Sequence, residues 1–179
     1  QWVRGLLALS LHRKANDFSV ATLNYELESQ FYIRPANDQG VEILAQIVCR
    51  RLAAKFVNEF RAMPKPRKLI ILGHSLGGLV ATYISQNKEM QNGLRLKCGL
   101  KCQTVYSIST PLHGSALLTS VRRNFPNLAR VSGLYSKVAD QMEEDSVFLQ
   151  KLQNACVRNS FCVTYRFGAG ECDYIVRPK

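Results

Sequence analysis

The sequence lacks any apolar run long enough to cross a membrane. A spanning helix needs about 20 consecutive apolar residues, so we expect no transmembrane helix. The first residues also lack an initiator Met and the pattern of a signal peptide. We therefore expect Gln1 to mark a cut rather than a natural N-terminus. The 179 residues suit a single domain, 1–179, with enough chain for a substantial core.

Acidic residues are few, 13 against 24 Lys and Arg, which gives a formal net charge of +11. A basic surface can meet anionic lipid headgroups or nucleic acid. The cations are spread over residues 50–51, 65–68, 97–101 and 122–123, and no nucleic-acid-binding motif accompanies them. We expect a solvated basic face and no nucleic-acid partner, and peripheral membrane contact stays open.

The cysteines lack the spacing of a zinc site. Of the six, only Cys98 and Cys102 are close in sequence, and neither a second pair nor a histidine lies near them. An even number fits disulfides only if the protein is secreted, so the redox compartment stays open. Cys49 and Cys162 fall in apolar patterns and are interpreted as small core residues.

The most informative stretch is residues 68–81, Lys-Leu-Ile-Ile-Leu-Gly-His-Ser-Leu-Gly-Gly-Leu-Val-Ala. An apolar run of strand length leads into Gly-x-Ser-x-Gly, and an amphipathic helical pattern follows. This order predicts a nucleophile elbow, in which a serine on a sharp turn presents its hydroxyl. We expect Gly73 and Gly77 to let strand and helix close on each other, and Gly78 to let the helix pack on the sheet. The alternative is an ordinary turn with a surface serine.

Periodicity divides the rest of the chain into alternating helices and strands. We expect helices at 2–14, 38–61 (capped by Asn37 or Asp38), 76–88 and from Asp145 or Ser146 onward, with shorter helical pieces at 116–140. Strands are expected at 18–25, 67–72, 104–109 and 161–167, and a basic loop at 91–101. This alternation predicts an α/β fold with a parallel sheet and flanking helices.

Three stretches together resemble the lipase-like branch of the α/β-hydrolase family, which includes bacterial triacylglycerol lipases and GPI-inositol-deacylase-like proteins. The first is Gly-His-Ser-Leu-Gly-Gly at 73–78, which resembles the family's nucleophile box. The second is Ser-Thr-Pro-Leu-His-Gly-Ser at 109–115, similar to the family's Thr-Pro-His-x-Gly-Ser loop. The third is the helix from residue 146 with a strand and then Asp-Tyr-Ile-Val at 173–176.

The resemblance implies a Ser-His-Asp triad that hydrolyses a hydrophobic acyl ester through an acyl-enzyme, without a metal or cofactor. Ser75 would be the nucleophile and Asp173 the acid that orients the histidine. The backbone amide of Leu76, the residue after the serine, is the expected first oxyanion donor. Weaker candidates for the acid lie earlier in the chain: Asp140, Glu143, Glu144 and Asp145.

The histidine of such a triad is missing where the fold's order of serine, acid, histidine requires it. No histidine follows Asp173, and the three present are His12, His74 and His113. His113 could line the pocket, although a structural loop role is the preferred interpretation. The family's strand with a His-Gly oxyanion loop, which precedes the first helix, is also missing. We expect a fragment of a longer hydrolase that is itself inactive, or a degenerate relative.

Three functions stay open. The first is a lipase-like serine esterase, in which residues 115–140 lie where lipases carry a lid and hold apolar side chains suited to one. The second is a catalytically inactive binding or scaffold module on the same fold. The third is a thioesterase or acyltransferase with the same triad. Fold alone does not fix the substrate.

Overall fold

The computed structural model describes residues 40–60, 66–127, 136–158 and 163–168. Several predicted features lie outside the described residues. These are the helix at 2–14, the strand at 18–25, the cap at Asn37 or Asp38, and the loop that contains Asp173.

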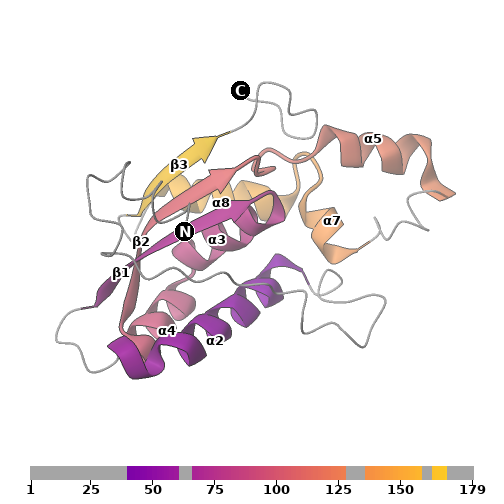
Figure 1. Cartoon of the computed structure of the whole chain (residues 1–179). Coiled ribbons are helices and arrows are strands. Elements are labelled where there is room, and N and C mark those ends of the chain that lie inside the picture. Colours follow the sequence, from indigo (N-terminus) through magenta and orange to yellow (C-terminus); the bar gives the residue numbers. More distant parts are fainter. Residues whose placement is uncertain (1–39, 61–65, 128–135, 159–162, 169–179) are drawn as a thin grey trace.

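The described chain alternates helices and strands (Figure 1). In order, the elements are α2 (Val41–Phe60), β1 (Arg67–His74), α3 (Leu76–Gln86), α4 (Lys88–Cys98), β2 (Leu100–Ile108), α5 (Ala116–Asn124), α7 (Lys137–Gln141), α8 (Val147–Arg158) and β3 (Thr164–Gly168). No described helix is long and apolar enough to span a bilayer.

The three strands form one parallel sheet in the order β1-β2-β3. β1 pairs with β2 from Arg67↔Leu100 to His74↔Ile108. An irregularity after Leu69 leaves Gln103 without a partner, because Leu69 is opposite Cys102 and Ile70 is opposite Thr104. The parallel sheet with flanking helices confirms the predicted α/β class.

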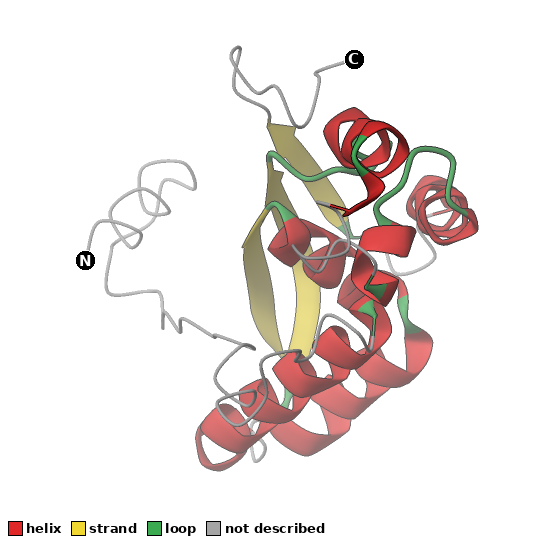
Figure 2. Cartoon of the chain, turned by 90° about the vertical axis from the view of Figure 1, so that its right-hand side faces the viewer, coloured by secondary structure: helices red, strands yellow, loops and turns green. Residues whose placement is uncertain are grey.

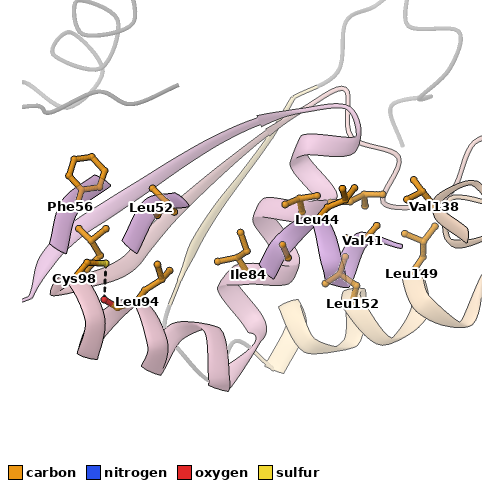
Figure 3. Packing of buried hydrophobic residues seen from close by; sticks show 14 residues of the cluster. Val41, Leu44, Leu52, Phe56, Ile84, Leu94, Cys98, Val138, Leu149 and Leu152 are labelled. Atoms are coloured by element: carbon orange, nitrogen blue, oxygen red, sulfur yellow. Dashed lines mark hydrogen bonds between the residues drawn. The ribbon is translucent and has the colours of Figure 1, made fainter. Parts of the chain in front are cut away.

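The described helices lie together on one face of the sheet (Figure 2). The core fills the layer between them, and Figure 3 shows it running from Phe56 and Cys98 at one end, past Ile84 and Leu44, to Leu149 and Leu152. α2 contributes an apolar stripe at helical spacing to this core: Val41, Leu44, Leu52 and Phe56 are buried. The loops that follow β1 and β2 therefore lie beside a packed layer of helices.

The basic loop predicted at 91–101 is wrong, because α4 and the start of β2 occupy it. Asn87 takes an extended conformation, ends α3 and accepts a hydrogen bond from the Met90 amide through its side chain. Gly99, at φ 64°, ends α4 in the left-handed region. Between these caps, α4 buries Gln91, Leu94 and Cys98 and leaves its cations exposed. Because the buried residues are few and the rest of the stretch is polar, its sequence has the pattern of a loop.

The other boundaries move by a few residues. α3 ends at Gln86 rather than 88, and β2 begins at Leu100 rather than 104. β3 covers Thr164–Gly168 and so extends one residue past the predicted end at 167, while residues 161–162 of the predicted strand lie outside the described residues. α8 begins at Val147, and the Ser146 hydroxyl accepts a hydrogen bond from the Leu149 amide. That bond favours Ser146 over Asp145 as the residue that opens this helix.

Candidate functional site

Ser75 is the single residue between the end of β1 and the start of α3. Its backbone has φ 52° and ψ −124°, a region that residues with a Cβ rarely adopt. Two backbone hydrogen bonds fix the turn: the Ser75 amide donates to Ile108 O at 2.9 Å, and the Gly78 amide donates to Ser75 O at 3.0 Å. The sharp turn therefore depends on the neighbouring strand as well as on the local sequence.

Two of the three glycines around Ser75 are required by close packing. A Cβ on Gly73 would lie 2.4 Å from Gly77 O, and a Cβ on Gly78 would lie 1.8 Å from Thr110 Oγ1. The prediction for Gly73 is therefore confirmed, whereas Gly78 is required by close contact with Thr110 in the loop after β2 rather than with a strand of the sheet. The prediction for Gly77 is wrong, because a Cβ there would meet nothing within 4 Å. It is the Gly77 carbonyl, rather than a missing side chain, that approaches the strand.

The Ser75 side chain is half-buried and lies at the C-terminal edge of the parallel sheet, where α3 begins. The amides of a helix's first turn carry partial positive charge. An anion formed on a substrate beside Ser75 would meet these donors, with the Leu76 amide nearest in sequence. The role of Leu76 as an oxyanion donor stays a prediction.

The loop after β2 packs against the same turn. It begins at Ser109, whose φ is 47°, and continues through the buried Thr110. Gly114, at φ 89°, passes so close to the backbone of Glu144 that a Cβ would lie 2.5 Å away. The Ser115 amide donates to Met142 O at 2.9 Å, and the Ser115 hydroxyl caps α5 by accepting from the Leu118 amide. The loop at 109–115, which resembles the family's Thr-Pro-His-x-Gly-Ser loop, is thus held by packing at Thr110 and by hydrogen bonds at Ser115.

Neither described histidine reaches Ser75. His113 is exposed, and its Nδ1 lies 3.5 Å from Nε2 of Gln153 on α8. His74 is exposed at the end of β1. Within the described ranges, no hydrogen bond joins the Ser75 hydroxyl to either ring. His12 and Asp173 lie outside the described residues, so the structure does not bring a triad together.

Two of the weaker acid candidates serve an ion-pair cluster instead. Arg122 on α5 binds Asp140 Oδ1 at 2.6 Å and Glu143 Oε1 at 2.5 Å, and its side chain is only 10% exposed. Burial alone would lower the pKa of Arg122, but the bonds to Glu143 and Asp140 outweigh it and raise that pKa. This cluster gives no local signal in the sequence, because the partners of Arg122 lie 18 and 21 residues away from it.

Among the described thiols, Cys98 and Cys102 are buried and Cys49 and Cys156 are half-buried, and burial raises the pKa of all four. Burial raises the pKa of Cys49 to about 12, with the nearby Cys98 adding to the effect. Burial likewise raises the pKa of Cys102 to about 12. All four described cysteines are free. No group of side chains in the described ranges could hold a metal ion. Cys162 lies outside them.

The segment predicted as a lid, 115–140, is described in part. α5 buries Leu118 against the molecule and leaves Leu117 49% exposed, and Phe125, which caps the C-terminus of α5, is 60% exposed. Residues 128–135 lie outside the described chain. Whether this segment covers the site stays a prediction.

Comparison with known proteins adds a family and a fold. The model of the family described as "Putative serine esterase (DUF676)" matches residues 25–156. A search of functionally curated proteins by sequence finds no significant match.

Among the solved structures that are similar to this chain are two bacterial enzymes. One is the lipase BlEst2 of Bacillus licheniformis in mature form, at 16% identity and a TM-score of 0.51, covering 73% of this chain and 48% of that one. The other is phospholipase PlaB of Legionella pneumophila in complex with thio-NAD, at 20% identity and a TM-score of 0.53, covering 78% and 28%. The chain thus spans about half the length of the first and about a quarter of the second. These similarities and the parallel sheet identify the fold as that of an α/β hydrolase.

Proposed function

Because the chain belongs to the family described as "Putative serine esterase (DUF676)", we propose that it carries the nucleophile of a lipase-like serine ester hydrolase. The observation that carries the proposal is the backbone of Ser75, at φ 52° on a turn between a parallel strand and a helix. A positive φ at a non-glycine residue costs free energy, and such conformations cluster at functional sites. The substrate class is a hydrophobic acyl ester or lipid, in line with the lipase and phospholipase that share the fold.

The reaction would follow the roles of a triad. The Ser75 hydroxyl attacks the ester carbonyl while a histidine takes its proton, and the Leu76 amide binds the oxyanion. The histidine then returns the proton to the leaving alcohol, and an acyl-enzyme remains. Water, activated by the same histidine, releases the acid. Asp173 holds the histidine's tautomer and stabilises its cation. Neither a metal nor a cofactor takes part.

The proposed histidine lies outside these 179 residues, since His74 and His113 make no hydrogen bond to Ser75 among the described residues. His113 is the in-chain alternative. It sits on the loop that packs against the Ser75 turn, and its exposed ring is bound only loosely, at 3.5 Å from Gln153.

The test is covalent labelling with a fluorophosphonate probe, which reacts only with an activated serine. The natural full-length protein should label and should hydrolyse a short p-nitrophenyl ester. Ser75→Ala should abolish both, whereas Ser120→Ala, at an exposed position on α5, should retain both. A folded full-length protein that neither labels nor hydrolyses would overturn the proposal in favour of a non-catalytic module. The 179-residue chain alone should label weakly or not at all, and strong labelling lost in His113→Ala would make His113 the base.

Peripheral contact with an anionic membrane is the second part of the proposal. Exposed cations gather at the start of the sheet: Lys97 lies in the last turn of α4, and Lys68 and Lys101 are direct cross-strand partners. Like charges opposite each other are unfavourable unless an anion lies nearby, and Leu96, 74% exposed, adds an apolar side chain beside Lys97. This edge lies roughly 25 Å along β1 from Ser75 at about 3.3 Å per residue, so it would tether the protein rather than admit substrate.

Sedimentation with lipid vesicles tests the tether. The protein should bind phosphatidylserine-rich vesicles and not phosphatidylcholine vesicles, and Lys97→Glu with Lys101→Glu should weaken binding at least about 10-fold, given about 1 kcal/mol per cation. Lys151→Glu, at an exposed position on α8, makes a single charge change elsewhere and should have a much smaller effect. Equal binding by all variants would exclude this edge.

A further inference from the structure

We propose that Thr110 is a positioning residue, which keeps Ser75 in its positive-φ conformation by acting on the two backbone groups that restrain it. The inference rests on the proposed function of Ser75. Thr110 is buried in the loop after β2 and touches no reacting atom. We infer its role from the two groups that its side chain contacts, the Ile108 carbonyl and Gly78.

The first restraint is the Ile108 carbonyl. It accepts the Ser75 amide at 2.9 Å, the bond that joins the turn to β2. The Thr110 hydroxyl donates to the same carbonyl at 3.4 Å. Ile108 ends β2, and the chain turns sharply at Ser109 immediately after it. The Thr110 hydroxyl is thus a second donor to the carbonyl that binds the Ser75 amide, at the point where the strand ends.

The second restraint is Gly78, whose amide donates to Ser75 O at 3.0 Å. The Thr110 side chain fills the space where a Gly78 Cβ would be, with Oγ1, Cβ and Cγ2 at 1.8, 2.8 and 2.9 Å from that point. Thr110 therefore packs directly on the first turn of α3. The Thr110 side chain thus contacts one partner in each of the two hydrogen bonds that restrain Ser75. It binds the Ile108 carbonyl, which accepts the Ser75 amide, and it packs on Gly78, whose amide donates to the Ser75 carbonyl.

The loop that carries Thr110 is itself fixed. The Thr110 carbonyl accepts the Leu112 amide at 2.8 Å, the Pro111 carbonyl accepts the Gly114 amide at 3.1 Å, and Ser115 is bound to Met142. The loop backbone that carries the Thr110 side chain is therefore fixed by these hydrogen bonds. Threonine suits the position because the hydroxyl satisfies the carbonyl while the methyl group packs, and valine would supply only the second.

The test compares Thr110→Val, which keeps the shape and removes the hydroxyl, with Thr110→Ser, which keeps the hydroxyl. In the natural full-length protein, Thr110→Val should slow fluorophosphonate labelling and lower kcat for a short soluble ester about 10-fold with KM nearly unchanged, because a small misplacement of a nucleophile is costly. Thr110→Ser should stay within about 3-fold of wild type. Thr164→Val, which removes an exposed hydroxyl at the start of β3, should leave both rates unchanged.

Hydrogen exchange of the Ser75 amide, followed by NMR, gives a readout that does not depend on activity. Thr110→Val should accelerate this exchange several-fold while exchange in α2 stays the same.

If Ser75→Ala abolishes labelling but Thr110→Val labels at the wild-type rate, the positioning role is overturned and the proposed function stands. If no variant labels but Thr110→Val accelerates Ser75 exchange, the positioning role stands and the proposed function fails. Unchanged exchange overturns the inference. If Thr110→Val does not fold, Thr110→Ala takes its place.

Discussion

Ser75 holds a backbone conformation that costs about 1–3 kcal/mol for a residue with a Cβ. The surroundings offset that cost with two hydrogen bonds and with close backbone contacts that only glycine allows. The three glycines nearby are therefore not equivalent. Gly73 and Gly78 are fixed by steric contact, whereas Gly77 faces open space.

Alanine at Gly73 and at Gly77 should have opposite effects on stability. Gly73→Ala places a Cβ 2.4 Å from a carbonyl that cannot move without shifting α3, and should lower the free energy of unfolding by at least about 2 kcal/mol. Gly77→Ala meets no atom within 4 Å and should raise stability by about 0.5–1 kcal/mol, as expected for a helical glycine. Urea unfolding measures both. Equal destabilisation by the two substitutions would contradict the packing.

The buried thiols predict a loss of stability at alkaline pH. In the unfolded chain a cysteine ionises near pH 8.5, whereas Cys49 and Cys102 have their pKa raised to about 12 in the folded protein. Between these values the folded state binds more protons than the unfolded state, so stability falls as pH rises. The slope is at most about 1.4 kcal/mol per pH unit for each thiol. Urea unfolding between pH 7.5 and 9.5 should show the fall under reducing conditions, and Cys102→Ala should make the slope shallower.

At the scale of elements, strands and the turn at Ser75 could be predicted because their signals are local. The apolar run at 69–72 and the glycines at 73, 77 and 78 stand next to one another in the sequence. α4 was missed because its identity depends on two caps, Asn87 and Gly99, and on three residues buried by other elements. The roles of Thr110 and Arg122 could not be predicted either, since both depend on partners more than 15 residues away or on backbone groups.

The caps of α4 give a prediction for that helix. Asn87→Ala removes the side-chain acceptor for the Met90 amide and should destabilise the protein by about 1 kcal/mol, the usual cost of losing an N-cap. Asn92→Ala, at an exposed position in the middle of the same helix, loses no cap and should be neutral or slightly stabilising because alanine favours helix. Thermal unfolding of the pair separates the two effects. If both asparagines behave alike, the cap does not define the helix start.

At the scale of the whole described molecule, distant parts of the chain are joined by polar bonds at one end of the core. The Val41 amide donates to Gln141 Oε1 at 2.8 Å, and Gln141 Nε2 donates to Glu42 at 2.7 Å. These bonds fix the start of α2 to the end of α7 across about 100 residues of sequence. Arg122 of α5 in turn binds Asp140 within α7 and Glu143 just after that helix.

We therefore expect Arg122 to hold α5 against the rest of the described molecule, while a role of α5 in a lid stays a prediction. Its guanidinium reaches Asp140 and Glu143, but both carboxylates are partly exposed, so their loss should cost the whole fold only about 1 kcal/mol. The local effect should be larger: Arg122→Gln should speed amide exchange in residues 116–124 by an order of magnitude, because the ion pairs are the polar attachment of α5 to the α7 turn. Arg123→Gln, exposed beside it, should leave exchange unchanged. Exchange mass spectrometry at pH 7 measures both. If wild-type α5 already exchanges as fast as the Arg122→Gln variant, the ion pairs do not hold α5 in place.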